Sequence, residues 1–173
     1  MARELLLLRH AKSDWDSGAA TDFERPLAKR GRRDAPRVGE WLYREGLVPS
    51  LILSSPAVRA RETALRVCKA LDKKKKEIRF NPRLYEADRE ALLSLLSACT
   101  DAGPILLLVG HNPGLEDLLR YLTDGNLDGQ DDQGKLLPTA ALARLEMPDD
   151  WNRLESGSAL LLGLIRPKEL SDA

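Results

Sequence analysis

Four consecutive leucines, Leu5 to Leu8, begin almost at the start of the chain and end abruptly at Arg9 and His10. A short, continuous apolar run bounded by polar residues is typical of a strand that is buried on both faces of a parallel sheet. Ligands of open parallel sheets bind in the crevice beyond the carboxyl ends of the strands. Arg9 and His10 are therefore expected at the edge of the sheet where a ligand would bind.

Two further apolar runs end in the same manner. Residues 105–110 lead to His111, which together with His10 makes up the whole histidine content of the chain. Residues 51–53 lead to Ser54-Ser55-Pro56, and Arg59 falls in the first turn of the helix that should follow. Because the carboxyl ends of parallel strands meet at one edge of a sheet, we expect two histidines and two arginines to gather there. Such a cluster would form a compact site for a phosphoryl group.

The alternation of strand and helix patterns predicts an α/β fold with a mostly parallel central sheet and helices on both faces. Strands are expected at residues 5–8, 51–53, 77–80 and 105–109, with two closing strands within residues 136–147 and 158–165. Helices are expected near residues 28–45, 56–71, 89–100 and 113–122. We expect one domain over residues 1–173, because this length suits a single hydrophobic core and no internal repeat is visible.

Serine, proline and polar stretches refine this prediction. Ser55 is a favourable N-cap, and Pro56 is then the first residue of its helix. Pro36 lies inside a helical pattern, which predicts a kink or a late helix start. The lysine run at residues 73–76 and the polar stretch at residues 124–134 are expected to form surface loops.

The composition excludes several functional classes. Lysine plus arginine and aspartate plus glutamate number 27 each, and aromatic residues make up 5%. A zero net charge with few aromatic residues argues against a nucleic-acid-binding protein. No apolar run approaches the roughly 20 residues that span a bilayer, and no secretory signal is evident. The isolated Cys68 and Cys99 suit a reduced compartment, so we expect a cytoplasmic protein. We also expect no contact with a membrane, and a monomer or a weak dimer.

The residue types of the cluster suit phosphoryl chemistry. A phosphoryl group resists nucleophiles because its charged oxygens repel them, so a site must neutralise these oxygens and hold the attacking atom in line. Arginine performs the first task through its rigid fork of donors, and neutral histidine performs the second as a covalent nucleophile. Arg9 and Arg59 should lower the pKa of His10 and keep it unprotonated, whereas a bound phosphate should raise the pKa of His111 and favour a cationic clamp.

Other interpretations of the same residues remain open at this point. A histidine at a strand end is often only a polar residue with satisfied hydrogen bonds. Two histidines without clustered ligand spacing give weak support to a metal site, so we expect no metal. Ser13 and Ser55 are competing nucleophiles, but Ser13 lies in a turn and Ser55 is better explained as a helix cap.

Three segments of the chain resemble the ordered signatures of the histidine phosphatase superfamily. Leu8 to Ser13 resembles the Arg-His signature, Ser54 to Thr63 the second motif, and Val109 to Gly114 the third. The segment Arg25 to Gly31 and the short length are similar to the SixA-type phosphohistidine phosphatases. The resemblance spans nearly the whole chain and implies the three-layer phosphoglycerate-mutase-like fold.

The resemblance also implies roles for particular residues. His10 would be the nucleophile that becomes phosphorylated, and Arg9, Arg59 and His111 would bind the phosphoryl oxygens. Relatives that hydrolyse alkyl phosphates also use an acid near the end of the third strand. Glu86 is the candidate for this acid, with an exposed loop carboxylate as the alternative interpretation.

The residues and the resemblance together predict a metal-independent phosphohydrolase that uses no cofactor. The expected substrate is a protein that carries phosphohistidine. The alternative is a small-molecule phosphomonoesterase of the same superfamily, acting on a sugar or nucleotide phosphate. A non-catalytic module that binds phosphoproteins is a third possibility.

Overall fold

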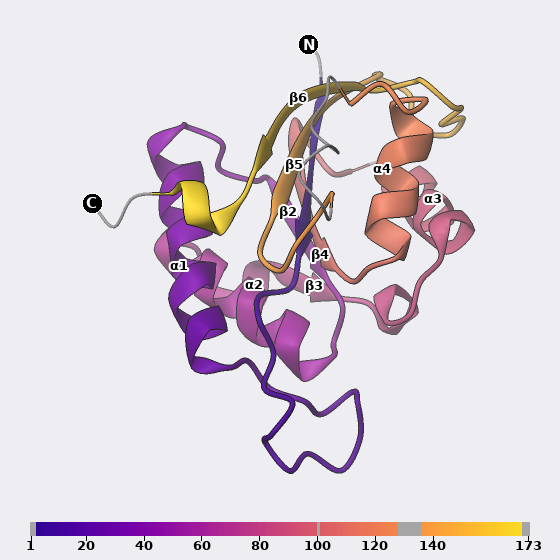
Figure 1. Ribbon diagram of the computed structural model, residues 1–173. Coiled ribbons are helices and arrows are strands. Elements are labelled where there is room, and N and C mark those ends of the chain that lie inside the picture. Colours follow the sequence, from indigo (N-terminus) through magenta and orange to yellow (C-terminus); the bar gives the residue numbers. More distant parts are fainter. Residues whose placement is uncertain (1–2, 100, 128–135, 171–173) are drawn as a thin grey trace.

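The computed structural model describes residues 3–99, 101–127 and 136–170, and its strands form one six-stranded sheet (Figure 1). The strand order is β3-β2-β4-β1-β5-β6. Strands β3, β2, β4 and β1 run parallel to one another, and β5 and β6 are added antiparallel. The strands are β1 (Arg3–Arg9), β2 (Leu51–Ser54), β3 (Ile78–Phe80), β4 (Ile105–Gly110), β5 (Leu142–Met147) and β6 (Leu160–Ile165). The mostly parallel sheet with antiparallel closing strands is therefore confirmed.

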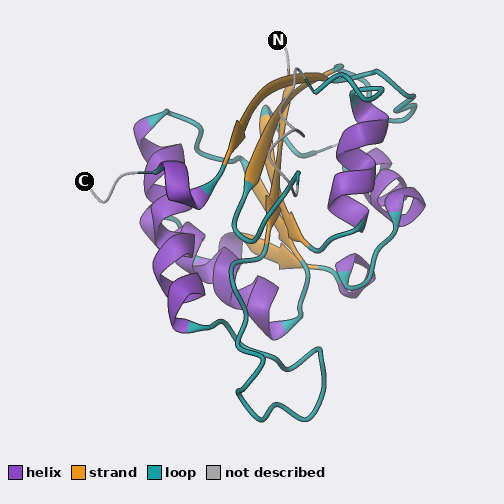
Figure 2. Cartoon of the chain, viewed as in Figure 1, coloured by secondary structure: helices purple, strands orange, loops and turns teal. Residues whose placement is uncertain are grey.

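Helices cover both faces of this sheet, as the sequence predicted. The helices are α1 (Lys29–Arg44), α2 (Val58–Ala70), α3 (Arg89–Ser97) and α4 (Gly114–Leu122), with short 3-10 turns η1 (Lys75–Glu77), η2 (Pro82–Leu84) and η4 (Pro167–Glu169). Figure 2 shows α1 and α2 on one side of the strands and α3 and α4 on the other. The three-layer arrangement is therefore confirmed.

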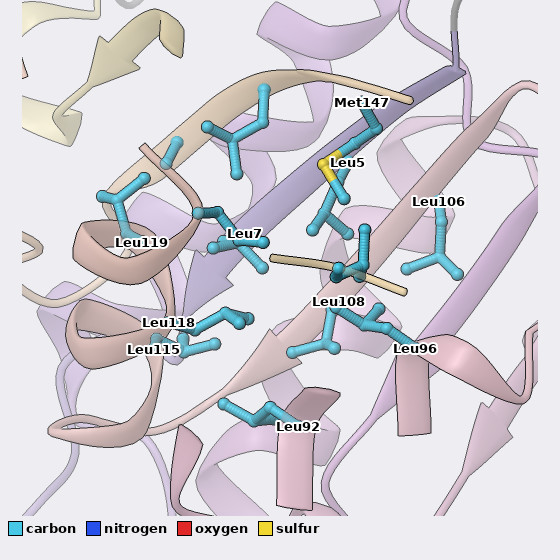
Figure 3. Close-up of a cluster of buried hydrophobic side chains, with 14 of the residues drawn as sticks. Leu5, Leu7, Leu92, Leu96, Leu106, Leu108, Leu115, Leu118, Leu119 and Met147 are labelled. Atoms are coloured by element: carbon cyan, nitrogen blue, oxygen red, sulfur yellow. The ribbon is translucent and has the colours of Figure 1, made fainter. Parts of the chain in front are cut away.

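The leucine run of β1 contributes to two hydrophobic cores at once. Successive side chains of a strand point to opposite faces, so Leu5 and Leu7 pack toward α3 and α4, whereas Leu6 and Leu8 pack toward α1 and α2. All four side chains have no exposed surface. Figure 3 shows the first of these cores, where Leu5 and Leu7 lie among leucines of β4, α3 and α4. Burial on both faces is the reason for a continuous apolar run instead of an alternating one.

The register of the central strands aligns their carboxyl ends. Arg9 at the end of β1 lies beside Gly110 at the end of β4, and Ser54 at the end of β2 lies beside Val109. The residues that directly follow these strands therefore leave the sheet at the same edge. This alignment brings together the polar residues that come after each apolar run.

Several local predictions need correction. Ser55 is not the N-cap of α2: the helix begins at Val58 with Ala57 as its N-cap, so Pro56 precedes the helix. The Ser55 hydroxyl is instead directed to His111, at 2.8 Å. The helix around Pro36 does not start late, because α1 begins at Lys29 and Pro36 lies inside it.

Other boundaries differ from the prediction by a few residues. The third strand begins one residue late because the 3-10 turn η1 ends at Glu77. Helix α3 ends at Ser97 instead of continuing to residue 100. The two closing strands are shorter than their predicted ranges. Of the predicted loop at residues 124–134, residues 128–134 lie outside the described part of the chain.

Candidate active site

Two backbone hydrogen bonds continue the sheet just beyond its carboxyl edge. The His10 amide donates to the Gly110 carbonyl at 3.0 Å, and the Ser55 amide donates to the Val109 carbonyl at 3.0 Å. The imidazole rings of His10 and His111 lie with their centroids 5.2 Å apart. The strand ends therefore place both histidines of the chain in one site, with Arg59 entering from α2.

The hydrogen bond of His10 fixes its tautomer. Its Nδ1 lies 2.8 Å from the Ala11 carbonyl oxygen, which can only accept, so Nδ1 carries the proton. The lone pair of the neutral ring is then on Nε2. His10 is 6% exposed, so this nitrogen is held in a largely buried setting. The arrangement supplies one unprotonated ring nitrogen in a fixed orientation.

Burial and neighbouring cations keep His10 uncharged at neutral pH. Its pKa is lowered to about 3, with burial as the largest cause and with His111, Arg59 and Arg9 as smaller contributions in the same direction. The hydrogen bond to Ala11 acts in the opposite direction but is outweighed. The predicted direction of the shift is confirmed, but desolvation contributes more than the arginines.

Thr63 of α2 connects the His10 loop to the Arg59 backbone. The Ala11 amide donates to the Thr63 hydroxyl at 3.0 Å, and this hydroxyl donates to the Arg59 carbonyl at 2.7 Å. Thr63 has no exposed surface. The two hydrogen bonds hold the segment after His10 at a fixed distance from the first turn of α2. A change in either partner would therefore move His10 relative to Arg59.

Three buried donor atoms of the cluster have no hydrogen-bond partner among the described residues. They are Nε of Arg9, Nε of Arg59 and Nδ1 of His111. Arg9 is anchored through Nη1 to the Leu137 carbonyl at 3.2 Å, and burial lowers its pKa from the ordinary value. Buried donors normally have partners, so three unpaired donors in one cluster need a specific explanation. An oxyanion, which has several acceptor oxygens, would satisfy them.

The loop between β1 and α1 contributes a carboxylate to the same site. Asp22 accepts from Arg59 Nη2 at 3.0 Å, from Arg25 Nη1 at 2.5 Å and from the Tyr85 hydroxyl at 2.6 Å. These hydrogen bonds, that of Tyr85 first, hold the pKa of Asp22 well below its usual range. Reciprocally, the bond raises the pKa of Tyr85 to about 12. Asp22 therefore stays ionised and partly neutralises Arg59.

Arg25 is held in place on both sides. Its Nε donates to the Ser13 hydroxyl at 2.9 Å, and its guanidinium lies 3.7 Å from the centroid of the Trp15 ring. The Trp15 ring is 72% exposed and thus covers Arg25 from the solvent side. Ser13, which the sequence offered as a competing nucleophile, is engaged as the partner of Arg25.

The Ser55 hydroxyl fixes the tautomer of His111. Ser55 is fully buried, and its Oγ accepts a hydrogen bond from the Ala57 amide at 3.2 Å. The hydroxyl proton then has one acceptor within reach among the described residues, Nε2 of His111 at 2.8 Å. With Ser55 donating to Nε2, the ring proton of neutral His111 is on Nδ1. Nδ1 is the nitrogen that has no partner in the described part of the chain, so His111 offers a donor without being charged.

His111 is neutral for the same physical reason as His10. Burial, the largest cause, and the Arg59 cation together lower its pKa to about 4, although the Asp22 carboxylate partly opposes the shift. The Tyr85 ring packs edge-on against His111, with centroids 5.6 Å apart. His111 can thus donate through Nδ1 at neutral pH in the uncharged form. The cationic clamp that the sequence suggested is not required for this hydrogen bond.

Glu86 lies beside the cluster in an unusual backbone conformation. Its φ is 59°, in the left-handed region. For a residue other than glycine this conformation costs about 1–3 kcal/mol of conformational energy. Glu86 is exposed and lines a pocket of 310 Å³ together with Arg59, Tyr85 and His111. The next residue, Ala87, lies so close to Gly114 that a Cβ atom on residue 114 would be 2.1 Å from the Ala87 carbonyl oxygen. The start of α4 therefore fixes the loop that carries Glu86.

Sequence reasoning named Arg9, His10, Arg59, Glu86 and His111 for this site. It assigned no site role to Asp22, Arg25, Thr63 or Tyr85, and it gave Ser55 a different role. The contacts of Asp22 span 37 residues to Arg59 and 63 residues to Tyr85, so no local spacing could reveal them. The mostly polar, turn-rich stretch that ends at Asp22, with Arg25 close behind it, was the available signal.

Two searches of the described residues bear on the class of site. No group of three or more histidine, cysteine, aspartate or glutamate side chains in the described ranges could hold a metal ion. Within the same ranges, no helix combines the length and apolar character needed to cross a membrane.

Comparisons with known proteins agree with the geometry. The model of the histidine phosphatase superfamily (branch 1) matches residues 5–98. An uncharacterized protein of Mycobacterium leprae is 31% identical over 166 residues, which cover 93% of this chain and 100% of the relative. The structure of the candidate phosphohistidine phosphatase SixA of Agrobacterium tumefaciens matches with a TM-score of 0.80 and 29% sequence identity. The match covers 96% of this chain and 99% of the SixA chain. A second such SixA structure, from Nakamurella multipartitia, has a TM-score of 0.79 and 28% identity, with 96% and 97% covered.

Proposed function

The chain belongs to the histidine phosphatase superfamily, whose members include phosphatases and mutases, and we propose that it is a phosphatase that acts through phosphorylation of His10. The proposed substrate is a protein that carries phosphohistidine. One observation carries the proposal: three unpaired buried donors lie in one cluster with a histidine whose Nε2 holds a lone pair. The similarity to the candidate SixA phosphatases over nearly the whole chain supports the choice of substrate.

The first step is binding of the phosphoryl group between the arginines and His111. Nε of Arg9, Nε of Arg59 and Nδ1 of His111 would each donate to a phosphoryl oxygen, and the two guanidinium charges would neutralise the dianion. Preorganised donors of this kind stabilise the charge that develops in the transition state without reorganising during the reaction. The Asp22 carboxylate would share Arg59 with the substrate and thereby limit how tightly a phosphate product is retained.

The second step is in-line attack of His10 Nε2 on phosphorus. The phosphorus–nitrogen bond forms while the bond to the leaving group breaks, and the leaving group keeps the electron pair of that bond. His10 carries a proton on Nδ1 throughout, and the Ala11 carbonyl stabilises the positive charge that the ring acquires. A water molecule then attacks phosphorus, the phosphorus–nitrogen bond breaks, and neutral His10 and inorganic phosphate are regenerated.

The leaving group decides whether an acid is needed. An alkoxide leaves poorly and requires a proton, whereas the imidazole of phosphohistidine leaves readily once it is protonated. Asp22 and Glu86 are two of the carboxyl groups that line the pocket beside Arg59 and His111. Asp22 is unsuitable as an acid, because its hydrogen bonds hold its pKa well below the usual range. Glu86 is exposed and lines the pocket beside Arg59 and His111, so we propose Glu86 as the acid when the leaving group needs one.

A phosphomonoesterase that acts on a small sugar or nucleotide phosphate is the second candidate function. The pocket of 310 Å³ beside Arg59 and His111 favours it, because Glu86 lines this pocket and could protonate an alkoxide there. A phosphoprotein-binding module without activity is less well supported, because binding alone does not require a free lone pair on His10.

Parallel assays would distinguish these functions. The chain is incubated with a protein phosphorylated on histidine, with para-nitrophenyl phosphate and with a panel of sugar and nucleotide phosphates, and kcat/KM is compared. A phosphohistidine phosphatase has its highest kcat/KM on the phosphoprotein. A preference for one small phosphate would favour the second function, and binding without turnover of any substrate would favour the module.

We further propose that the enzyme works without a metal ion and in the cytoplasm. The two guanidinium groups supply the positive charge that a metal would otherwise provide. Cys68 and Cys99 are free and buried, as expected of thiols that are kept in a reducing compartment.

A further inference from the structure

A second basic cavity lies on the α1 side of the molecule, apart from the catalytic cluster. It has a volume of 400 Å³. Figure 1 shows the η4 turn beside α1, and these two elements form its opposite walls. The cavity is lined by Arg30, Arg33, Asp34 and Arg37 of α1, by Pro138 and Thr139, and by Arg166, Pro167 and Lys168. We refer to it as the α1–η4 pocket.

The charges of the α1–η4 pocket are strongly unbalanced. Among the residues that the structure describes, five cationic side chains and one carboxylate, that of Asp34, line it. Asp34 lies 3.9 Å from Arg30, 3.7 Å from Arg33 and 3.8 Å from Arg37, so one negative charge is shared by three guanidinium groups. On the opposite wall, Arg166 is buried and pairs with Glu169 at 3.7 Å. The whole chain has no net charge, so this concentration of positive charge is local.

From this lining we propose that the α1–η4 pocket binds a small polyanion with two or more linked phosphoryl groups, such as inorganic tripolyphosphate or a nucleoside triphosphate. Arginine is suited to bidentate contact with phosphate oxygens. Cations stand on two facing walls, Arg30 and Arg33 on α1 and Lys168 on η4, so a ligand with separated phosphoryl groups can contact both. A concave cavity of this volume fits a small molecule better than the flat surface of a protein partner.

The α1–η4 pocket and the catalytic cluster share one wall but no lining side chain. The Leu137 carbonyl accepts from Arg9, whereas the neighbouring Leu136 carbonyl accepts from Arg166 at 3.5 Å. The Thr139 hydroxyl then accepts from Arg30 at 3.4 Å. Neighbouring residues of one segment thus contact side chains of the two sites. Ligand binding in the pocket is therefore separable from phosphate binding near His10, and it does not depend on the proposed activity.

Calorimetric titration with tripolyphosphate, ATP and a polyglutamate peptide tests the proposal. The variants are Arg33→Gln and Lys168→Gln, one from each wall, with Arg44→Gln as the control for loss of a charge from the far end of α1. Arg33 and Lys168 are exposed, so both variants should fold, and their melting temperatures verify this. Arg59→Ala removes a phosphate donor from the catalytic cluster.

We expect tripolyphosphate to bind to Arg59→Ala as well as to the unchanged chain. Each pocket variant should weaken this binding by about tenfold or more, the effect of one lost charge-assisted hydrogen bond, and Arg44→Gln by less than about twofold. Equal binding of ATP would identify the phosphate chain as the recognised group, and tighter binding of ATP would extend the site to the nucleoside. Loss of binding in Arg59→Ala alone, equal effects of Arg33→Gln and Arg44→Gln, or tight binding of a polyglutamate peptide in place of tripolyphosphate would overturn the proposal.

Discussion

Replacing Ser55 with alanine should impair catalysis through His111 and not through the fold. The hydroxyl donates to Nε2 of His111 and thereby places the ring proton on Nδ1, where the phosphoryl group would accept it. Without Ser55, nothing among the described contacts fixes this tautomer. A buried ring nitrogen that loses its partner costs about 1–3 kcal/mol. If this loss falls on the transition state, kcat/KM decreases by roughly 5- to 150-fold.

The pH profile distinguishes this role from a structural one. Protonated His111 carries a proton on Nδ1 whether or not Ser55 is present. Lowering the pH should therefore restore part of the activity that Ser55→Ala loses. The pKa of His111 is lowered to about 4, and its protonated fraction grows as the pH falls toward that value. His10, whose pKa is about 3, is still predominantly neutral there and keeps its lone pair. The ratio of wild-type to Ser55→Ala activity should therefore be largest near pH 8 and shrink toward pH 5.

Ser54→Ala is the matched control. Ser54 is also fully buried, but its hydroxyl bonds to the carbonyls of Ser55 and Ala60 and not to a histidine. This variant should lose stability without an acid-dependent recovery of kcat/KM. The same pH profile in Ser54→Ala and Ser55→Ala, or an unchanged profile in Ser55→Ala, would refute the tautomer argument. Complete loss of activity at every pH would instead indicate that Ser55 itself is the nucleophile.

Three further predictions concern the charges of the site. Arg59→Ala should lower kcat/KM by about 10²–10³-fold, whereas the exposed Arg61→Ala should stay within about twofold; similar losses in both would remove Arg59 from phosphate binding. Glu86→Gln should reduce hydrolysis of alkyl phosphates by about 10²–10⁴-fold and that of phosphohistidine far less, and equal losses on both substrates would exclude Glu86 as the acid. Activity should survive dialysis against EDTA, and loss that added Mg²⁺ or Zn²⁺ reverses would contradict metal independence.

The fold was predictable because its main signals are local. A run such as Leu5 to Leu8 shows burial on both faces directly, since each residue type reflects its own environment. The register of β1, β2 and β4 then follows from packing these runs side by side, and it aligns the residues after them. For this reason His10, His111 and Arg59 could be grouped from sequence alone.

The parts of the site that were missed depend on contacts between distant segments. Ser55 and Pro56 have the local sequence of a helix start, but the strand continues its hydrogen bonding at Ser55, and the hydroxyl finds His111 56 residues away. Asp22 lies in a polar loop whose sequence shows no periodicity, and its role emerges only where the loop meets Arg59 and Tyr85. Local propensity was overridden in both cases by tertiary hydrogen bonds.

The sequence also could not assign causes to the pKa shifts. The arginines were expected to lower the pKa of His10, and they do, but burial is the larger cause. Burial depends on how completely the surrounding loops cover a side chain, which no motif specifies. The same holds for the α1–η4 pocket, whose two walls are separated by about 130 positions in the sequence.

A phosphoryl group on His10 during turnover is the most direct test of the central claim. The enzyme is mixed with ³²P-labelled substrate and denatured rapidly in alkali, because a phosphorus–nitrogen bond survives alkali and is broken by acid. Label should remain on the chain, disappear on brief acid treatment and be absent from His10→Ala, whereas His111→Ala should still be labelled, more slowly. An acid-stable label, as expected for phosphorylated Ser55, or a label that persists in His10→Ala, would contradict the mechanism.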